Sequence, residues 1–233
     1  MTQRKQMKRL AAPKGMKILR KAGIWTVRTH AGPHTAKNAV PLLVLVRDYL
    51  KLTDTARETR KIIKAEQVLV DGRPITDVQF SVGFMDIVTI PASKKSYRIL
   101  FDEKGRIVAN ETSEKSNFKL CRIEKIMQTK HGVQLTMHDG RNIITKEKLG
   151  TGDVLKIEVP TQKILEHYPL KEGSVAYIIA GKHAGETVKI SGIIPGTITR
   201  RKQIQFKIGE RDVTTPHDYV FVVGKDKPAI SLK

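Results

Sequence analysis

Residues 41–90 decide the fold, and they read PLLVLVRDYLKLTDTARETRKIIKAEQVLVDGRPITDVQFSVGFMDIVTI. Pro41 opens an apolar run over 42–52 that is interrupted only by Arg47, Asp48 and Lys51. A proline is tolerated at the first position of a helix, because the N–H that it lacks would have no partner there. The run therefore predicts a helix. A buried strand is the alternative, because LLVLV is rich in β-forming residues.

A second helix is predicted to begin near Thr55, because Thr55 and Glu58 have the spacing of a capping box. At about 100° per residue, its residues divide into a basic face and a face of small or apolar residues. Glu58 is the only acidic residue between Thr55 and Ala65, so salt bridges do not balance the basic face. A solvated face is the alternative, but the imbalance favours phosphate binding. The basic face holds Arg57, Arg60, Lys61 and Lys64, and the opposite face holds Ala56, Thr59, Ile62 and Ile63.

A hairpin follows the basic helix. Asp71-Gly72 separates the short runs 68–70 and 73–75. A type I′ turn needs positive φ at both central positions, which Asp-Gly supplies. A further strand is predicted at 87–90, so the order is helix, basic helix, hairpin and strand.

This arrangement resembles the S4-type RNA-binding module. In that family the second helix and the hairpin grip structured RNA, so the resemblance implies that the helix cations and Arg73 of the hairpin contact RNA. Thr55 and Asp71 stand where the family pattern has a small residue and an asparagine. Both departures are mild and leave the predicted fold unchanged.

The composition also indicates a polyanionic partner. The chain has 233 residues and a net charge of +20, which repels itself unless a polyanion neutralises it. Nucleic acid is the expected partner. A membrane surface is disfavoured, because no basic helix carries a bulky apolar face. Cys121 is the single cysteine, which excludes an internal disulfide and a cysteine metal cluster, and it is expected to be a core residue. Without an apolar run of about 20 residues, the chain is expected to be cytoplasmic.

Residues 1–40 are predicted to be a basic extended arm that becomes ordered on RNA. They carry half of the net charge and no acidic residue. Trp25 and the rings of His30 and His34 could stack on bases, but for Trp25 the favoured alternative is that it fastens the arm to the next domain. Gly32-Pro33 excludes a helical histidine pair, so a metal site is not expected. The expected RNA contacts are Arg4, Lys5, Lys8, Arg9, Lys14, Lys17, Arg20, Lys21, Arg28, His34 and Lys37.

The remaining chain is predicted to be mostly β. Alternating runs with turn pairs predict a central β-rich domain over 92–170. Residues 171–233 contain two β-rich runs around Gly181-Lys182-His183-Ala184-Gly185 and then a short tail. The layout resembles a KOW motif in an SH3-like barrel, in which Lys182 and His183 face the ligand. A following basic cluster is a further candidate for phosphate contact, with a solvated loop as the alternative; it consists of Arg200, Arg201 and Lys202.

The whole chain is similar to the small-ribosomal-subunit S4e family. The resemblance rests on KRLAAPKG (8–15), AGPH (31–34), HDGR (138–141), AGKHAGETVKI (180–190) and TRRKQIQFKIG (199–209), in this order around the S4-type module. It implies an α+β multidomain protein with a basic arm (1–40), an S4-type module (41–91), a central β-rich domain (92–170) and a KOW-containing barrel (171–233). It also implies a non-enzymatic structural protein of the ribosome, without cofactor or small-molecule substrate. Its expected partners are small-subunit ribosomal RNA and neighbouring ribosomal proteins.

Two other classes of protein use the same modules. An RNA-modifying enzyme can carry an S4-type module, but no stretch outside the module offers a nucleophile or acid at a useful spacing, and a GRLD element is missing. A transcription elongation factor can carry a KOW barrel, but it would need neither an acid-free arm nor an S4-type module.

Overall fold

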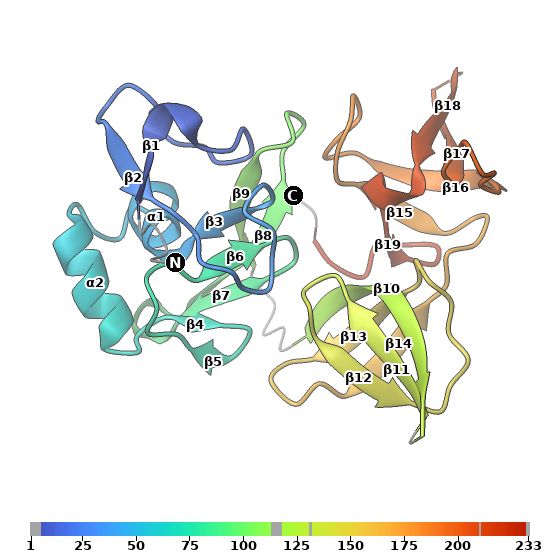
Figure 1. The fold of residues 1–233 in the computed structure, drawn as a ribbon, viewed down its shortest axis with the longest axis horizontal. Coiled ribbons are helices and arrows are strands. Elements are labelled where there is room, and N and C mark those ends of the chain that lie inside the picture. The colour runs from blue at the N-terminus through green and yellow to red at the C-terminus, as the bar shows by residue number, and fades with distance from the viewer. Residues whose placement is uncertain (1–5, 113–117, 131, 210, 232–233) are drawn as a thin grey trace. The chain divides into compact units, whose positions relative to one another are not determined.

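The computed structural model describes residues 6–112, 118–130, 132–209 and 211–231. The chain forms two compact units, of which the first comprises 1–101 and 106–119 and the second 102–105 and 120–233. Both units consist mainly of antiparallel strands (Figure 1). None of the helices in the described ranges has the length and apolar character needed to cross a membrane.

The first unit is organised around a five-stranded sheet with the order β5-β4-β7-β8-β9. Two short pairs of strands, β1 with β2 and β3 with β6, accompany it. The strands are β1 (Gln6–Lys8), β2 (Trp25–Val27), β3 (Ala39–Pro41), β4 (Leu69–Val70), β5 (Arg73–Pro74), β6 (Ser81–Gly83), β7 (Ile87–Ile90), β8 (Lys95–Phe101) and β9 (Ile107–Thr112).

The predicted first helix is confirmed but is shorter than expected. It consists of α1 (Leu42–Val44) and a π-helical turn, Leu45–Tyr49. Pro41 is the N-cap residue and not the first helical residue. The Leu50 amide donates to the Leu45 carbonyl at 3.0 Å, and Lys51 then adopts a left-handed φ of 51°. This conformation ends the helix, because a residue with left-handed backbone angles cannot extend a right-handed helix.

The second helix, α2 (Ala56–Lys64), and the hairpin after it agree with the prediction. The Thr55 hydroxyl accepts from the Glu58 amide and the Glu58 carboxylate accepts from the Thr55 amide, which completes the capping box. In the hairpin, Asp71 has φ 50° and Gly72 has φ 73°. These values are those of a type I′ turn, whose twist matches that of the flanking strands β4 and β5.

The border that the sequence suggested at residue 91 does not separate two sheets. Strands β8 and β9, expected in the central domain, extend the sheet of the first unit, because β8 pairs antiparallel with β7. Only the short 91–94 connection joins β7 to β8, and its Lys94 has a left-handed φ of 53°. A connection this short leaves antiparallel neighbours as the available arrangement.

The prediction that residues 1–40 form an extended arm is wrong for residues 6–40. This segment packs on the rest of the first unit. Ala12 and Met16 are buried, and the Ile107 amide donates to the Gly15 carbonyl at 2.9 Å. The Lys17 amide donates to the Tyr49 hydroxyl at 2.6 Å. Burial raises the pKa of Tyr49 to about 12. The segment is poor in apolar residues but gains main-chain partners from the module, which composition does not reveal.

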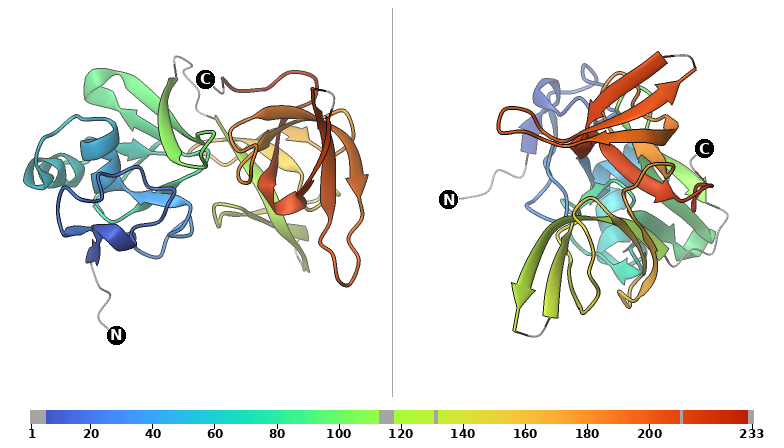
Figure 2. Two further views of the ribbon diagram at one scale, coloured as in Figure 1. Left: turned by 90° about the horizontal axis from the view of Figure 1, so that it is seen from above. Right: turned by 90° about the vertical axis from the view of Figure 1, so that its right-hand side faces the viewer.

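The second unit contains two five-stranded antiparallel sheets, ordered β12-β11-β10-β13-β14 and β18-β17-β16-β15-β19. Their strands run from yellow-green to red in Figure 2. In the second sheet β19, the last strand along the chain, pairs with β15, the first, as an SH3-like barrel requires. The assignment of this sheet as a KOW barrel stays a prediction. The strands are β10 (Phe118–Thr129), β11 (Gly132–Met137), β12 (Asn142–Thr145), β13 (Val154–Glu158), β14 (Ile164–Tyr168), β15 (Val175–Ile178), β16 (Thr187–Ile194), β17 (Gln203–Ile208), β18 (Arg211–Pro216) and β19 (Val220–Gly224).

Candidate nucleic-acid interface

Helix α2 presents the predicted basic face. Thr59 and Ile63 are fully buried and fix the helix on the module, which turns the opposite side outward. The four cations of that side are exposed, and none of them forms an ion pair with another residue of the described ranges. Cations that no carboxylate pairs remain available to an external anion. They are Arg57, Arg60, Lys61 and Lys64.

Asp71, the first residue of the hairpin turn after α2, anchors the hairpin to the protein interior through its carboxylate. One oxygen of its carboxylate accepts from the Ile87 amide at 3.0 Å, and the other lies 2.9 Å from the Lys119 ammonium. Arg73, the predicted RNA contact, is exposed on β5 directly after the turn. The anchored turn therefore sets the position from which Arg73 projects.

Lys119 joins Asp71 to a second buried carboxylate, Asp86. Its ammonium lies 2.5 Å from Asp86 Oδ1, and the side chains of all three residues are almost completely buried. Burial by itself would raise the pKa of Asp86, but Lys119, His34 and the Gly83 amide outweigh it and hold that pKa well below its usual value. Asp86 is therefore ionised, and the cluster fastens the hairpin turn to the entry of β7.

His34 was predicted to contact RNA, and the structure contradicts this. Its ring is buried, and Nε2 lies 3.0 Å from Asp86 Oδ1. A Cβ at Gly83 would lie 2.3 Å from the His34 ring, so only glycine leaves room for the ring at this position. His34 therefore holds the N-terminal segment on the module and is not available to RNA.

The basic residues of the N-terminal segment fall into two groups. Arg9 and Arg20 donate to main-chain carbonyls of their own segment, and Arg20 alone reaches those of Ala12 at 2.8 Å and Pro13 at 3.0 Å. Their guanidinium groups thus hold the loops together. Arg4 and Lys5 lie outside the described residues. The exposed cations are Lys8, Lys14, Lys17, Lys21, Arg28 and Lys37.

Trp25 is 55% exposed on β2, so its ring does not fasten the segment to the module. His30, in contrast, is held by Asp77, with 2.8 Å between Nδ1 and Oδ2. The exposed indole remains a candidate for stacking on a base.

In the second unit the predicted contacts lie in two loops. The loop between β15 and β16 carries Lys182, which is exposed, and His183, whose Nδ1 lies 3.4 Å from Glu186. The connection between β16 and β17 carries the other cluster. There Arg200 and Arg201 are exposed, Lys202 is half-buried, and Arg201 pairs with Asp218 at 2.8 Å.

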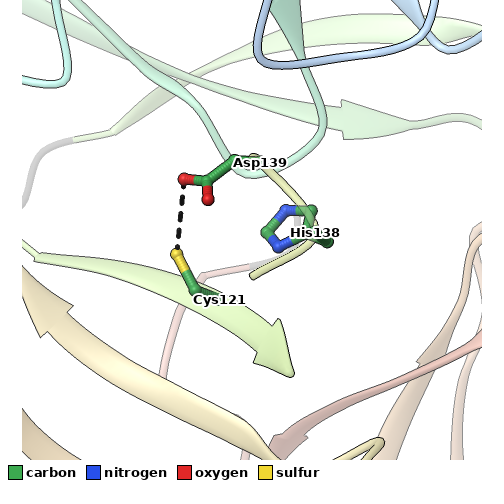
Figure 3. A group of neighbouring side chains, drawn as sticks. All are labelled: Cys121, His138 and Asp139. Atoms are coloured by element: carbon green, nitrogen blue, oxygen red, sulfur yellow. Dashed lines mark hydrogen bonds between the residues drawn. The ribbon is translucent and has the colours of Figure 1, made fainter. Parts of the chain in front are cut away.

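Cys121, His138 and Asp139 have ligand atoms within 4.8 Å of one another (Figure 3). Each already has a partner within the unit. The Cys121 thiol points to Asp139 Oδ2 at 3.6 Å, Asp139 pairs with Arg141 at 3.1 Å, and the Arg122 amide donates to His138 Nδ1 at 3.2 Å. Cys121 also belongs to an aliphatic core cluster. The group anchors the turn between β11 and β12.

Sequence reasoning missed the buried cluster of Lys119, Asp71 and Asp86. Its signal was a single lysine in the apolar run FKLCRI, where residues 119–123 are all buried and both faces of β10 are therefore covered. The two partners are 48 and 33 residues away in the chain, so no local pattern could pair them with Lys119.

Comparison with known proteins agrees with this architecture. Three family models match the chain: the RS4NT (NUC023) domain over 1–37, the S4 domain over 40–88 and the ribosomal family S4e over 93–164. The small ribosomal subunit protein eS4 of Methanothermobacter thermautotrophicus is 43% identical over 238 residues, which cover 100% of this chain and 97% of the relative. The protein of the same name from Archaeoglobus fulgidus is 45% identical, with 97% of each chain covered.

A solved structure has the same fold. The crystal structure of the 30S ribosomal protein S4e from Thermoplasma acidophilum matches with a TM-score of 0.71 at 35% identity, and the match covers 84% of this chain and 99% of that one. Identity above 40% over almost the full length, the domain matches in sequence order and the shared fold all point to the same conclusion, namely that this chain belongs to the ribosomal S4e family.

Proposed function

We propose that the chain is a structural constituent of the small ribosomal subunit that binds ribosomal RNA and works in the cytoplasm as part of the ribosome. The observation that carries the proposal is the exposed face of α2, where four cations stand without an ionic partner among the described residues. The relatives are named small ribosomal subunit proteins, and the chain, as a member of this family, is not an enzyme.

The proposed mechanism is binding without turnover. Lysines and arginines release counterions from the RNA backbone, and this release supplies much of the affinity. The deep major groove of A-form RNA hides its base edges, so a helix and a hairpin recognise shape and phosphate positions. In this protein α2 and Arg73 would form the central contact with RNA, and the exposed cations of residues 8–37 would enlarge that contact.

The loops of the second unit would add further contacts to RNA. Lys182 and His183 lie in the proposed KOW loop, and Arg200, Arg201 and Lys202 form the second cluster. Neighbouring ribosomal proteins would complete the set of partners.

The direct test is sedimentation of a cell lysate through a sucrose gradient. The protein should migrate with the small ribosomal subunit and remain there in moderate salt. A position at the top of the gradient, or with RNA polymerase after nuclease treatment, would overturn the proposal.

The contribution of α2 is tested by replacing Arg57 and Arg60 with glutamate in the full-length protein. The matched control replaces Lys104 and Arg106, two exposed cations of the β8–β9 turn, in the same way. Both variants change the net charge equally, so a difference between them reports which surface lies near the RNA, because charges further away than about 8 Å are largely screened at physiological salt. The α2 variant should lose most of its RNA affinity and the control little. Equal affinities in two folded variants would reject α2 as the contact surface.

A further inference from the structure

A cavity of ≈ 400 Å³ lies in the first unit where the N-terminal segment meets α2. Its wall is built from parts of the chain that are distant in sequence: Val27 of β2, His30 of the loop after it, Arg60 of α2, and Asp77 and Val78 of the segment before β6. The volume falls within the range of ligand sites in proteins. The packing of residues 6–40 on the module thus creates a concave site that the module alone would not have.

The cavity divides the basic face of α2 into two pairs. Arg60 and Lys64, which are one helical turn apart, line the cavity. Arg57 and Lys61 belong to the same exposed face but are not among the lining residues. The inner pair can therefore hold the phosphates of a nucleotide that enters the cavity, while the outer pair can contact only RNA that passes over the helix.

Asp77 gives the cavity a polarity that a phosphate site would not have. Its Oδ1 accepts from the Gln79 amide at 2.9 Å, and its Oδ2 lies 2.8 Å from His30 Nδ1. A carboxylate offers about four acceptor positions, so these bonds leave capacity for two more. The side chain is 43% exposed. Two cations beside an accepting carboxylate fit a ligand with anionic groups at one end and N–H donors at the other.

We infer that this cavity receives an unpaired nucleotide of the bound RNA. The inference rests on the proposed function and names the ligand of one part of the interface. The phosphates lie on Arg60 and Lys64, the N–H edge of the base meets Asp77, and the His30 ring with the two valines contacts the plane of the base. Guanine fits best, because N1–H and the N2 amino group are adjacent donors, whereas adenine turns its N1 acceptor toward the carboxylate. Bases that have left the stack are the usual sites of specific RNA recognition.

The test measures the affinity of the full-length protein for three synthetic RNA hairpins that differ only in one position, which carries a bulged G, a bulged A or no bulge. The wild type should bind the bulged-G hairpin about tenfold more tightly than the other two, as a good two-bond contact to a base allows. Replacing Arg60 and Lys64 with glutamine should abolish that preference. Replacing Arg57 and Lys61 with glutamine should weaken binding to all three hairpins alike and keep the preference.

Asp77→Asn provides a second readout, because asparagine retains an acceptor for the Gln79 amide but presents an N–H toward the base. It should reduce the preference for G over A without weakening binding to the uninterrupted hairpin. Equal wild-type affinities for the three hairpins, or equal effects of the two glutamine pairs, would overturn the nucleotide site and leave the assignment to the small subunit intact. A protein that binds none of the hairpins and does not migrate with the subunit would fail both proposals.

Discussion

Lys119→Met tests whether the buried charge cluster supports the hairpin of the interface. The Lys119 side chain is 1% exposed and contacts two carboxylates that are 5% and 2% exposed, so the variant leaves two buried anions without this cation. Removal of one partner from a buried ion pair costs about 3–5 kcal/mol. With a urea m-value of about 2 kcal/mol/M, the unfolding midpoint at pH 8 should fall by about 1.5–2.5 M.

The pH dependence of this variant has a definite sign. In the wild type the depressed pKa of Asp86 adds stability above the pKa of an unfolded aspartate, and this stability is lost only as the pH falls through the lower folded value. In the variant Lys119 no longer offsets the effect of burial on Asp86, so the pKa of the Asp86 carboxyl rises and the folded state takes up protons as the pH falls from 8 to 5. The difference in unfolding free energy between the two proteins should therefore shrink over this interval.

The assay is urea denaturation followed by circular dichroism at both pH values. Lys95→Met is the matched control, because Lys95 pairs with Glu111 at 3.0 Å but both side chains are about half exposed. Exposed ion pairs contribute little to stability, so this midpoint should hardly move. If Lys119→Met unfolded at the same urea concentration as the control, or if its deficit grew toward pH 5, the cluster would not stabilise the fold by fastening the hairpin turn to β7.

Three further changes test separate contacts. Thr55→Ala removes the N-cap of α2 and should lower the unfolding free energy by about 1 kcal/mol, and an unchanged urea midpoint would contradict the role of the capping box. Gly83→Ala places a methyl group against the His34 ring and should cost about 1–3 kcal/mol as the ring is forced away from Asp86; a wild-type midpoint would show that the ring yields freely. Arg57→Gln should reduce the slope of log affinity against log salt by about 1 in filter-binding measurements, whereas an unchanged slope would mean that Arg57 touches no phosphate.

The sequence by itself determined the elements whose causes are local. The Thr55–Glu58 capping box, the alternation of cations and apolar residues along α2 and the positive-φ turn at Asp71-Gly72 each depend on residues within a few positions of one another. For this reason the basic face of the candidate interface was predictable. The order of the modules along the chain was likewise sufficient to identify the family.

Only the tertiary structure decided which polar groups the protein uses for itself. The His34 ring, a predicted RNA contact, instead pairs with Asp86, 52 residues away, and the Arg20 guanidinium, another predicted contact, binds main-chain carbonyls. The same holds for β8, whose pairing with β7 joins it to the first unit. Contacts between distant residues depend on which surfaces pack together when the chain folds. Composition and local periodicity describe only neighbouring residues, so they do not predict these contacts.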